Sequence, residues 1–524
     1  MRAVSSLLFN VPPLFAELGR GLAGDIDCSA VAINSYSLDN SPYSVRPQAI
    51  VYPKNATDLK HIISFAREYG MPITVCGKRL SRSGGTLGEG IIVDMTRHFT
   101  QVRHVNMLEH TITVDAGVTV KTLREKLRGW HMEIPVLTAQ DNDATIGGLV
   151  ATKSSNPSSF HHGTIREWIE SATIMVDSGE EHRIADGITP SGRLLGIYQS
   201  VFPILAEQSP VIRANKPKTN DDASGYSLWN TSIGPRQLLD EIVGSEGTLG
   251  IITTVTLRLT SYKPHVLTTV IPILELSILT SHIDIAKHHR AEHIFLCDST
   301  FVTLTEKFHP GLFPELPQSS HTLLVTHTDT DREKLHNKVR LFTKALGDPR
   351  GSCIQTENGA MINHISESKY LFSLLDAYSG GTHVASTIAE GLIVPLHEYG
   401  NFITSLHEYL SSLGNTYVIT GNAGSGHVSV IALFDPRSPT YEAELSRYAQ
   451  AVFSLVKKFK GGISATSGDG IIRTPYLSYI YNDATLSIFK KIKEAWDPRL
   501  IFNPGKKVSI TTQYLHDHIR GLAS

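Results

Sequence analysis

The chain has 524 residues, which is more than one hydrophobic core usually serves, so two or three domains are expected. Its 48 Lys and Arg residues nearly balance 50 Asp and Glu residues, with no block of like charge, which argues against a nucleic-acid-binding surface. No apolar run approaches the ~20 residues that cross a bilayer, and the four cysteines lack the spacing of a zinc site or a disulfide scaffold. A cytoplasmic protein without a transmembrane segment is therefore expected.

The first regular elements predict a parallel sheet. Residues 1–44 lack strong periodicity and are expected to form an N-terminal extension. Residues 49–52 and 72–75 have the composition of strands, and between them apolar residues recur at helical spacing before Gly70: Leu59, Ile62, Ile63 and Ala66. Because a helical crossover joins parallel strands, these segments predict a βαβ unit.

A glycine-rich loop follows the second strand. It combines glycines, hydroxyls and three cations: Cys76, Gly77, Lys78, Arg79, Leu80, Ser81, Arg82, Ser83, Gly84 and Gly85. Successive backbone N–H groups in such a turn form an anion-binding concavity, which Ser or Arg donors complete. The loop is therefore a candidate phosphate site, although the same composition also occurs in ordinary solvated turns.

The pair Gly147 and Gly148 marks a second candidate loop, because it interrupts an apolar, strand-forming context. The other residues of interest in this loop and its continuation are Thr145, Thr152, His162, Gly163 and Thr164. The surrounding pattern predicts strands over residues 111–115 and 171–176 and a helix over residues 120–129. Two such loops suggest one shared ligand.

Three glycines, Gly244, Gly247 and Gly250, interrupt the otherwise strand-like residues 243–252. Glycine weakens a strand unless the chain bends sharply or lies against a ligand, so backbone contact with a bound cofactor is expected here. Residues 254–259 then alternate between polar and apolar as in a half-buried strand. The glycine turn and this strand form one unit.

From residue 263 the pattern changes to longer apolar runs and His-containing helices such as residues 396–413, which predicts a separate α+β domain. Residues 270–279 and 452–459 are expected to pack in its core. Near the end of the chain, two prolines and a glycine hold the apolar residues of 497–506 in a fixed turn.

Four of these segments resemble, in order, the motifs of FAD-linked oxidases of the vanillyl-alcohol oxidase type, in the branch of D-lactate and glycolate dehydrogenases. The similar segments are the 77–85 pyrophosphate loop, the "TIGG" segment at 145–164, the "GSEGTLG" signature at 244–250 and the terminal "DPxxxxNPGK" at 497–506. The resemblance implies an α+β fold. It consists of a two-lobed PCMH-type FAD-binding domain over residues 45–262, an α+β cap (substrate) domain over 263–480, and a segment over 481–524 that packs back on the FAD domain.

The resemblance also implies FAD, with its pyrophosphate on residues 77–85, its flavin near 145–164 and its adenine or ribose near 246–251. A Rossmann fold is disfavoured, because residues 78–80 break the G-x-G-x-x-G spacing. Some relatives attach flavin through a His in the first loop, where this chain has Lys78 and Arg79, so non-covalent FAD is expected. The expected FAD-binding residues are Cys76, Gly77, Lys78, Arg79, Leu80, Ser81, Ser83, Gly84, Thr145, Gly147, Gly148, Thr152, His162, Gly163, Thr164, Glu246, Gly247, Gly250, Ile251 and Asn503.

The cap motifs depart from the family. Relatives carry "GHxGDGNxH", whose two histidines bind a divalent metal, whereas residues 421–429 place Asn422 and Ser429 at those positions. Because neither replaces imidazole well at a transition-metal site, no bound metal is expected. His427, which falls at the family's Asn, is a candidate relocated base or a structural residue.

A second cap motif, the family's "SGEHGxG", resembles residues 466–472 without its histidine. Asp469 falls at or beside the acidic position and is either a base whose pKa is raised by burial or part of an Asp-Gly turn. Arg473 is expected to pair with a substrate carboxylate or with Asp469 itself.

These residues indicate an FAD-dependent oxidoreductase that removes hydride from a small hydroxylated substrate, with 2-hydroxy acids such as D-lactate or glycolate as first candidates. The alternatives are a sugar or aldonolactone oxidase and a flavin-binding protein that has lost turnover. Quinone, cytochrome and oxygen all stay open as electron acceptors, as do a homodimer and a peripheral membrane location.

Overall fold

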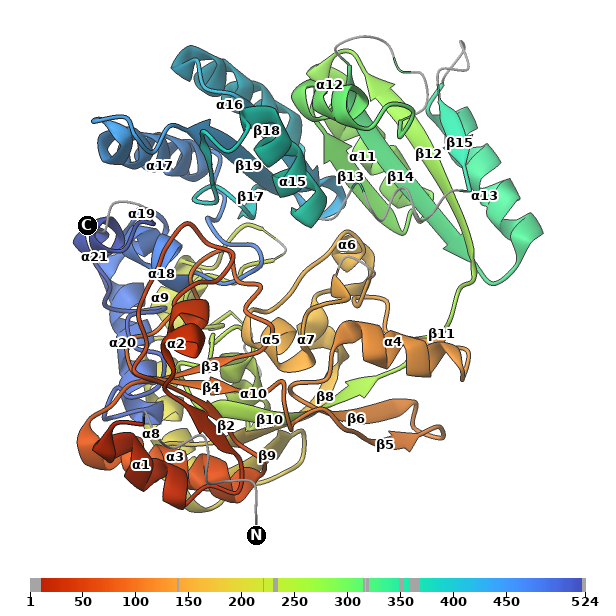
Figure 1. The fold of residues 1–524 in the computed structure, drawn as a ribbon. Helices are drawn as coiled ribbons and strands as arrows, with labels where there is room; N and C mark the ends of the chain where they lie inside the picture. Colours follow the sequence, from red (N-terminus) through yellow and green to blue (C-terminus); the bar gives the residue numbers. More distant parts are fainter. Residues whose placement is uncertain are drawn as a thin grey trace.

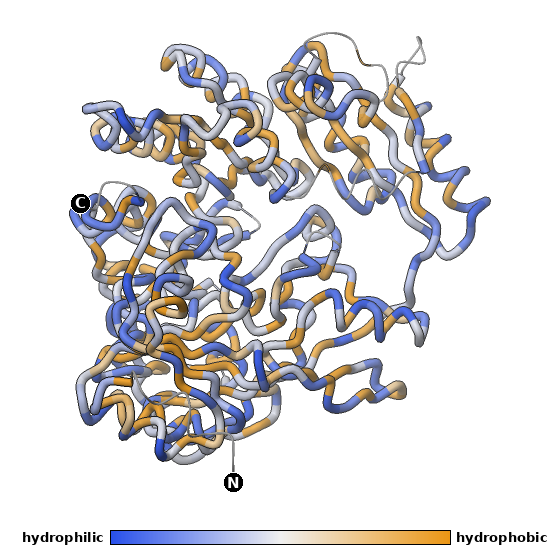
Figure 2. Tube along the Cα trace, in the orientation of Figure 1, coloured by the Kyte–Doolittle hydropathy of each residue, from blue (hydrophilic) through white to orange (hydrophobic). Residues whose placement is uncertain are grey.

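The computed structural model describes residues 11–138, 141–219, 221–229, 234–313, 316, 320–347, 353–357, 365 and 368–520. Figure 1 shows a basal lobe, built from residues 11–261 and 463–520, and a cap lobe, built from residues 265–458. Hydrophobic segments run through the sheets of both lobes in Figure 2. No helix among the described residues is long and apolar enough to cross a membrane.

The first basal sheet has four strands in the order β1-β2-β4-β3: β1 Asp25–Asp27, β2 Ala49–Tyr52, β4 Ile91–Asp94 and β3 Ile73–Cys76. The predicted strands β2 and β3 both run parallel to β4, which lies between them and which the sequence reading missed. Helix α3 (Ala56–Tyr69) makes the crossover. Its N-cap Asn55 accepts a hydrogen bond from the backbone N–H of Asp58, and Gly70 ends it in the left-handed region at φ 62°.

The second basal sheet is antiparallel in the order β5-β6-β10-β8-β9: β5 Val102–Asn106, β6 Thr111–Asp115, β10 Ile251–Arg258, β8 Ile169–Met175 and β9 Glu181–Ala185. The strand predicted after the three glycines is its central strand. A small pair, β7 (Met132–Glu133) and β11 (Thr260–Ser261), lies where the chain leaves for the cap lobe.

The basal helices that precede the cap are α1 Pro13–Arg20, α2 Ala30–Tyr36, α4 Val120–Arg128, α5 Ile146–Ala151, α6 Ser159–His162, α7 Ile165–Trp168, α8 Gly192–Glu207, α9 Ser209–Ala214 and α10 Arg236–Ile242. Residues 11–44 are part of this lobe, because Phe15 and Leu18 of α1 are buried in its core and β1 pairs with β2. The weak periodicity there reflects short elements, not an absence of structure.

The glycine pair Gly147 and Gly148 lies in helix α5, so the strand-forming context expected from the sequence was wrong. Thr145 caps the helix by accepting a hydrogen bond from the Gly148 N–H at 3.3 Å. A Cβ on Gly147 would come within 2.7 Å of the Ala116 Cβ, so the glycine allows the helix to pack directly on the adjacent chain.

The cap lobe contains one antiparallel sheet in the order β15-β12-β14-β13-β18-β19-β16, with β17 also paired to β19. Its strands are β12 His265–Ile273, β13 His293–Cys297, β14 His321–Asp329, β15 Ile354–Thr356, β16 Val384–Ser386, β17 Leu392–Ile393, β18 Tyr417–Asn422 and β19 His427–Phe434. Its helices are η3 Leu276–Ile278, α11 Leu279–His288, α12 Ser299–Phe308, α13 Arg332–Ala345, α15 Ser368–Ser379, η4 Leu396–Glu398, α16 Tyr399–Leu413, η5 Ala423–Ser425 and α17 Tyr441–Lys458. Val270 and Val452 are fully buried, as predicted for their segments, but Leu274 and Ile278 are exposed, so only part of residues 270–279 packs in the core.

After the cap, the chain returns to the basal lobe as α18 Gly470–Arg473, η6 Thr474–Tyr476, α19 Leu477–Ile480, α20 Asp483–Trp496 and α21 Thr512–Asp517. The turn at 497–506 then reaches the first sheet. Ile73 donates its N–H to the Ile501 carbonyl, and the Asn503 N–H bonds the Ile73 carbonyl, both at 2.7 Å. The basal lobe is therefore built from both sides of the cap.

Candidate functional site

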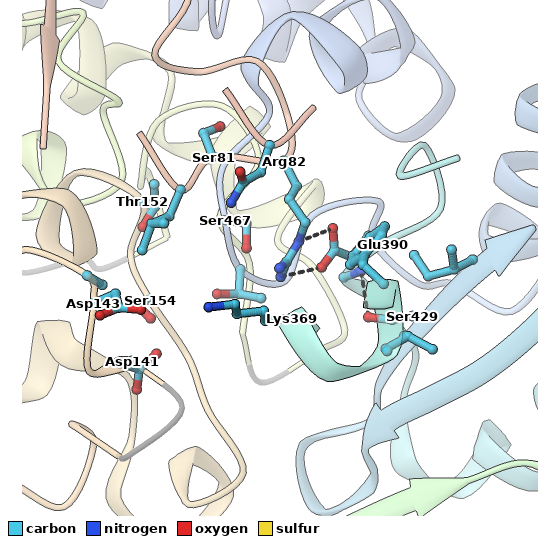
Figure 3. Close-up of a pocket in the computed structure, with 18 of the residues that line it drawn as sticks. Ser81, Arg82, Asp141, Asp143, Thr152, Ser154, Lys369, Glu390, Ser429 and Ser467 are labelled. Atoms are coloured by element: carbon cyan, nitrogen blue, oxygen red, sulfur yellow. Dashed lines mark hydrogen bonds and ion pairs between the residues drawn. The ribbon is translucent and has the colours of Figure 1, made fainter. Parts of the chain in front are cut away.

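A cavity of about 1090 Å³ lies where the two lobes meet. The basal lobe lines it with residues 77–82, 141–145 and 154–156, and the cap lobe lines it with parts of α15, β18 and β19. Figure 3 shows Asp141, Asp143 and Ser154 on the basal side and Ser429 on the cap side. The volume slightly exceeds the usual range of about 300–1,000 Å³ for small-molecule and cofactor sites.

The first glycine-rich loop forms part of the cavity wall. Arg79 has a positive φ of 55°, and its guanidinium lies 4.0 Å from the centre of the Tyr36 ring. The Ser81 hydroxyl accepts the Gly85 N–H at 2.9 Å, which tightens the turn. A Cβ on Gly77 would lie 2.2 Å from the Thr145 Oγ1, so this glycine lets the first and second loops touch.

Of the twenty expected FAD-binding residues, those that line the cavity are Gly77, Lys78, Arg79, Leu80, Ser81, Thr145, Gly148 and Thr152. The expected residues outside the lining are Cys76, Ser83, Gly84, Gly147, His162, Gly163, Thr164, Glu246, Gly247, Gly250, Ile251 and Asn503. His162 instead pairs with Glu292 of the cap lobe at 2.5 Å, and Thr164 caps α7. The structure therefore brings the first two loops together around one cavity.

The third glycine segment folds around a buried charge network. Glu246 accepts hydrogen bonds from the N–H groups of Asp469 and Gly470, and its carboxylate lies 3.2 Å from the Lys507 Nζ. Lys507 also pairs with Asp469 at 3.0 Å. Burial alone would lower the pKa of Lys507, but the carboxylates of Asp469 and Glu246 raise it above its usual value. The Lys507 ammonium is thus held charged inside the lobe.

Asn503 joins the same region. Its side-chain amide donates to the carbonyls of Gly85 at 3.0 Å and Glu246 at 2.7 Å, and Thr74 donates to its carbonyl oxygen at 3.1 Å. One buried side chain therefore connects the first and third glycine segments.

Asp469 and Arg473 lie behind the cavity wall, and both are fully buried. The Asp469 Oδ2 is bonded by the Gly225 N–H at 2.7 Å as well as by Lys507. Arg473 donates to the carbonyls of Gly468 at 2.5 Å and Glu390 at 2.6 Å. These contacts occupy Arg473 within the protein and connect Gly468 of the basal lobe to Glu390 of the cap lobe.

His427, the first residue of β19, lines the cavity and is 3% exposed. Its Nε2 lies 3.0 Å from the Asp221 Oδ2, which also accepts the Ser155 hydroxyl at 3.1 Å. Burial would raise the pKa of Asp221, but the hydrogen bond and charge of His427 hold it below its usual value. Since an ionised carboxylate only accepts, Nε2 carries the proton of this hydrogen bond. Nδ1 is buried and has no hydrogen-bond partner among the described residues.

An ion pair crosses the cavity between the lobes. The Arg82 guanidinium pairs with the Glu390 carboxylate at 2.6 and 2.8 Å, as the dashed lines in Figure 3 show. Lys369 of α15 extends into the same space.

The departures from the family's metal motif also lie at this site. Asn422 and Ser429 both line the cavity, and the Ser429 hydroxyl accepts the Gly391 N–H at 3.1 Å. In the described part of the chain, no three or more His, Cys, Asp or Glu side chains cluster as metal ligands would.

Sequence reasoning missed Asp221, Ser155 and Glu390. Asp221 lies 206 residues from His427, and an Asp-Asp pair in a polar stretch carries no signal of its partner. The sequence contains one indication of a different polar group at this site, because Asn422 and Ser429 replace the two metal-binding histidines of the family.

Two family models match the chain. An FAD binding domain matches residues 47–185, and the C-terminal domain of FAD linked oxidases matches residues 278–507. The chain is 24% identical to D-2-hydroxyglutarate dehydrogenase of Escherichia coli (strain K12) over 93% of its own length and 50% of that protein. It thus spans about half the length of such relatives.

Shorter relatives match along most of both chains. The chain is 25% identical to the glycolate oxidase subunit GlcD of Bacillus subtilis (strain 168), covering 90% of this chain and 91% of that one. It is 23% identical to D-lactate dehydrogenase of Anaerostipes hadrus, covering 88% and 89%. Among solved structures, 4-ethylphenol oxidase from Gulosibacter chungangensis has a TM-score of 0.69 at 14% identity, over 97% of this chain and 99% of that one. This last likeness supports the fold alone.

Proposed function

We propose that this chain, which belongs to the FAD-linked oxidases and dehydrogenases of the vanillyl-alcohol oxidase type, dehydrogenates a 2-hydroxy acid to the 2-oxo acid. The observation that carries the proposal is the His427–Asp221 pair on the wall of the cavity where the first two glycine loops meet. Relatives named for D-2-hydroxyglutarate, D-lactate and glycolate support the substrate class.

FAD is the cofactor, and the residues at the cavity fit it. Gly77 and Ser81 offer a close backbone approach and a hydroxyl, Lys78 offers a cation for the pyrophosphate, and Thr145 and Thr152 line the adjoining wall. Bound FAD would supply the acceptor for the hydride that leaves the hydroxyl-bearing carbon.

His427 is proposed to remove the hydroxyl proton. Its Nδ1 takes the proton from the substrate oxygen as two electrons and the other hydrogen leave the carbon, so the C–OH group becomes C=O. Asp221 favours the tautomer in which Nδ1 carries the lone pair, and it stabilises the positive charge that the ring gains. Asp469, whose Oδ2 is bound by Lys507, is proposed to hold the 466–470 segment in place.

The test is the substitution His427→Gln, with His407→Gln as the matched control, because His407 is a partly buried cap histidine outside the cavity lining. Loss of a general base costs about 10²–10⁴-fold in rate, so kcat on 2-hydroxy acids should fall by that range while FAD stays bound. Turnover near the wild-type rate in His427→Gln would refute the base assignment.

Visible spectra of the flavin under anaerobic conditions distinguish the proposed function from its alternatives. Bleaching of the flavin by a 2-hydroxy acid supports the proposal. Bleaching only by sugars or aldonolactones supports an oxidase of that class, and no bleaching by either supports a flavin-binding protein without turnover. Acid precipitation should release FAD into the supernatant, whereas yellow colour that stays with the pellet would contradict non-covalent binding.

A further inference from the structure

One face of the cap sheet changes from polar to apolar along the cavity. In β18 and β19, Thr420 pairs with Ser429, and Val418 pairs with Ile431. Since side chains two residues apart in a strand share a face, Ser429, Ile431 and Leu433 point the same way, and all three line the cavity. From Ser429 to Leu433 this strip extends roughly 13 Å at about 3.3 Å per residue.

Neighbouring strands continue both halves of the strip. At the polar end, Asn422 and Thr420 lie beside Ser429, close to His427. At the apolar end, Ala385 pairs with Leu433 across β16. Phe295 of β13 lies opposite Asn422, at the polar end of the strip, and lines the cavity.

Helices α12 and α15 complete the apolar end. Phe301 of α12 and Phe372 of α15 line the cavity and pack in one cluster with Ile431 and Leu433. Ile431, Leu433 and Phe301 are already buried, whereas Phe295, Phe372 and Ala385 are only partly buried, so a bound group could cover these three further.

The charges around this wall accommodate few anions. Lys369 is the single Lys or Arg that the described cap lobe contributes to the lining. In the described cap lobe, the acids of the lining are Glu390, which is already paired with Arg82, and Asp376 of α15. One substrate carboxylate would therefore find a cap-lobe cation, whereas a second carboxylate beside Phe295 and Phe372 would lose its hydration without a further cap-lobe cation.

We infer that the preferred substrate is a 2-hydroxy acid with one carboxylate and an apolar side chain of several carbons or an aromatic ring. Its hydroxyl lies at the His427 end, and its side chain packs against the partly exposed Phe295, Phe372 and Ala385. This inference rests on the proposed function and narrows it: glycolate and lactate would leave the apolar strip uncovered, and 2-hydroxyglutarate would place a charge on it.

The first test is a kcat/KM series on the FAD-loaded enzyme with glycolate and with the D forms of lactate, 2-hydroxyhexanoate, 2-hydroxyoctanoate, 3-phenyllactate and 2-hydroxyglutarate. Each methylene buried should raise kcat/KM up to about fourfold, so 2-hydroxyoctanoate and 3-phenyllactate should exceed lactate at least tenfold. A maximum at glycolate, lactate or 2-hydroxyglutarate would overturn the inference while leaving the proposed function intact.

Binding keeps the inference testable if no compound is oxidised. Titration of the bound-flavin spectrum with pyruvate, 2-oxooctanoate and phenylpyruvate reports affinity without turnover. Tighter binding of the two larger acids would then support the apolar wall while the proposed function fails. If these two acids bound no more tightly than pyruvate, the inferred apolar contact with the substrate side chain would be wrong as well.

The variant Phe295→Ala tests the wall itself, with Phe308→Ala as control, because Phe308 packs against the same cluster but does not line the cavity. Phe295→Ala should lower kcat/KM for 2-hydroxyoctanoate about tenfold more than for lactate. The control should keep the wild-type ratio between the two substrates. Equal ratios in both variants would show that Phe295 does not contact the substrate side chain.

Discussion

The segments 77–85 and 244–250 are both rich in glycine, yet their glycines serve different neighbours. Gly77 lies at the cavity, where a Cβ would meet the Thr145 hydroxyl of the second loop at 2.2 Å. Gly250, at φ 151°, lies against the sheet, where a Cβ would meet the Met175 carbonyl at 2.6 Å. The first segment presents backbone to a cavity, and the second closes around Glu246 and its partners.

This difference shows that a glycine pattern indicates close contact with the backbone but does not indicate whether a ligand or another part of the protein makes that contact. The expectation that all three glycine segments contact one cofactor is best supported for the first two, whose residues share the cavity. In the third, Gly250 lies against Met175, and Glu246 accepts hydrogen bonds from the N–H groups of Asp469 and Gly470. The two segments should therefore respond differently to substitution.

The largest expected effect is on stability, at Glu246. The substitution Glu246→Ala leaves the buried Lys507 ammonium with one acid and removes the partner of two backbone N–H groups. Breaking a buried pair in this way costs about 3–5 kcal/mol, which chemical unfolding of the FAD-free protein would measure. The control Glu170→Ala, on an exposed part of β8, should change the unfolding free energy by no more than ~0.5 kcal/mol. Similar stabilities for the two variants would argue against the network.

The next effect is on FAD affinity, at Gly77. The substitution Gly77→Ala forces Thr145 away from the first loop, at a cost of about 1–3 kcal/mol, and should weaken FAD binding about tenfold or more. Fluorescence titration of FAD into the FAD-free protein measures this. Gly196→Ala is the control, because its Cβ would meet only the Arg193 guanidinium, at 3.8 Å. If Gly77→Ala binds FAD as the wild type does, the two loops do not form one site.

The smallest effect is expected at Lys78, which is exposed at the mouth of the first loop. Lys78→Met removes the ammonium group that is proposed to contact the FAD pyrophosphate. An exposed ion pair of this kind contributes about 0.2–1 kcal/mol, so FAD should bind up to about fivefold more weakly. The loss should shrink at high ionic strength, since salt screens exposed charges. Lys54→Met, on the exposed loop after β2, should leave FAD affinity unchanged at every salt concentration.

Local pattern and motif order predicted much of the fold. The spacing of Leu59, Ile62 and Ile63 predicted α3, and the alternation after Gly250 predicted β10, because each depends on a periodic buried face. Helix α5 was misread because Gly147 and Gly148 have poor helix propensity, and the packing on Ala116 that favours them is not visible locally.

The candidate site was less predictable, because its pairs join distant parts of the chain. His427 was a candidate from sequence, but nothing at Asp221 indicates a partner 206 residues away. The same holds for Arg82 and Glu390, 308 residues apart. Motif resemblance identified the loops, whereas the contacts between lobes depend on tertiary structure.

The position of Lys507 has a consequence for how the chain acquires its structure during synthesis. The basal lobe contains β10 by residue 258, but Asn503 and Lys507, which bond its first and third glycine segments, emerge only after the whole cap has been made. At about 5–20 residues per second, a nascent basal lobe would wait roughly 10–50 s for these partners. During that interval Glu246 lacks its ammonium partner, so the cap is expected to fold first and the basal lobe to become protease-resistant only after Asn503 and Lys507 have emerged from the ribosome.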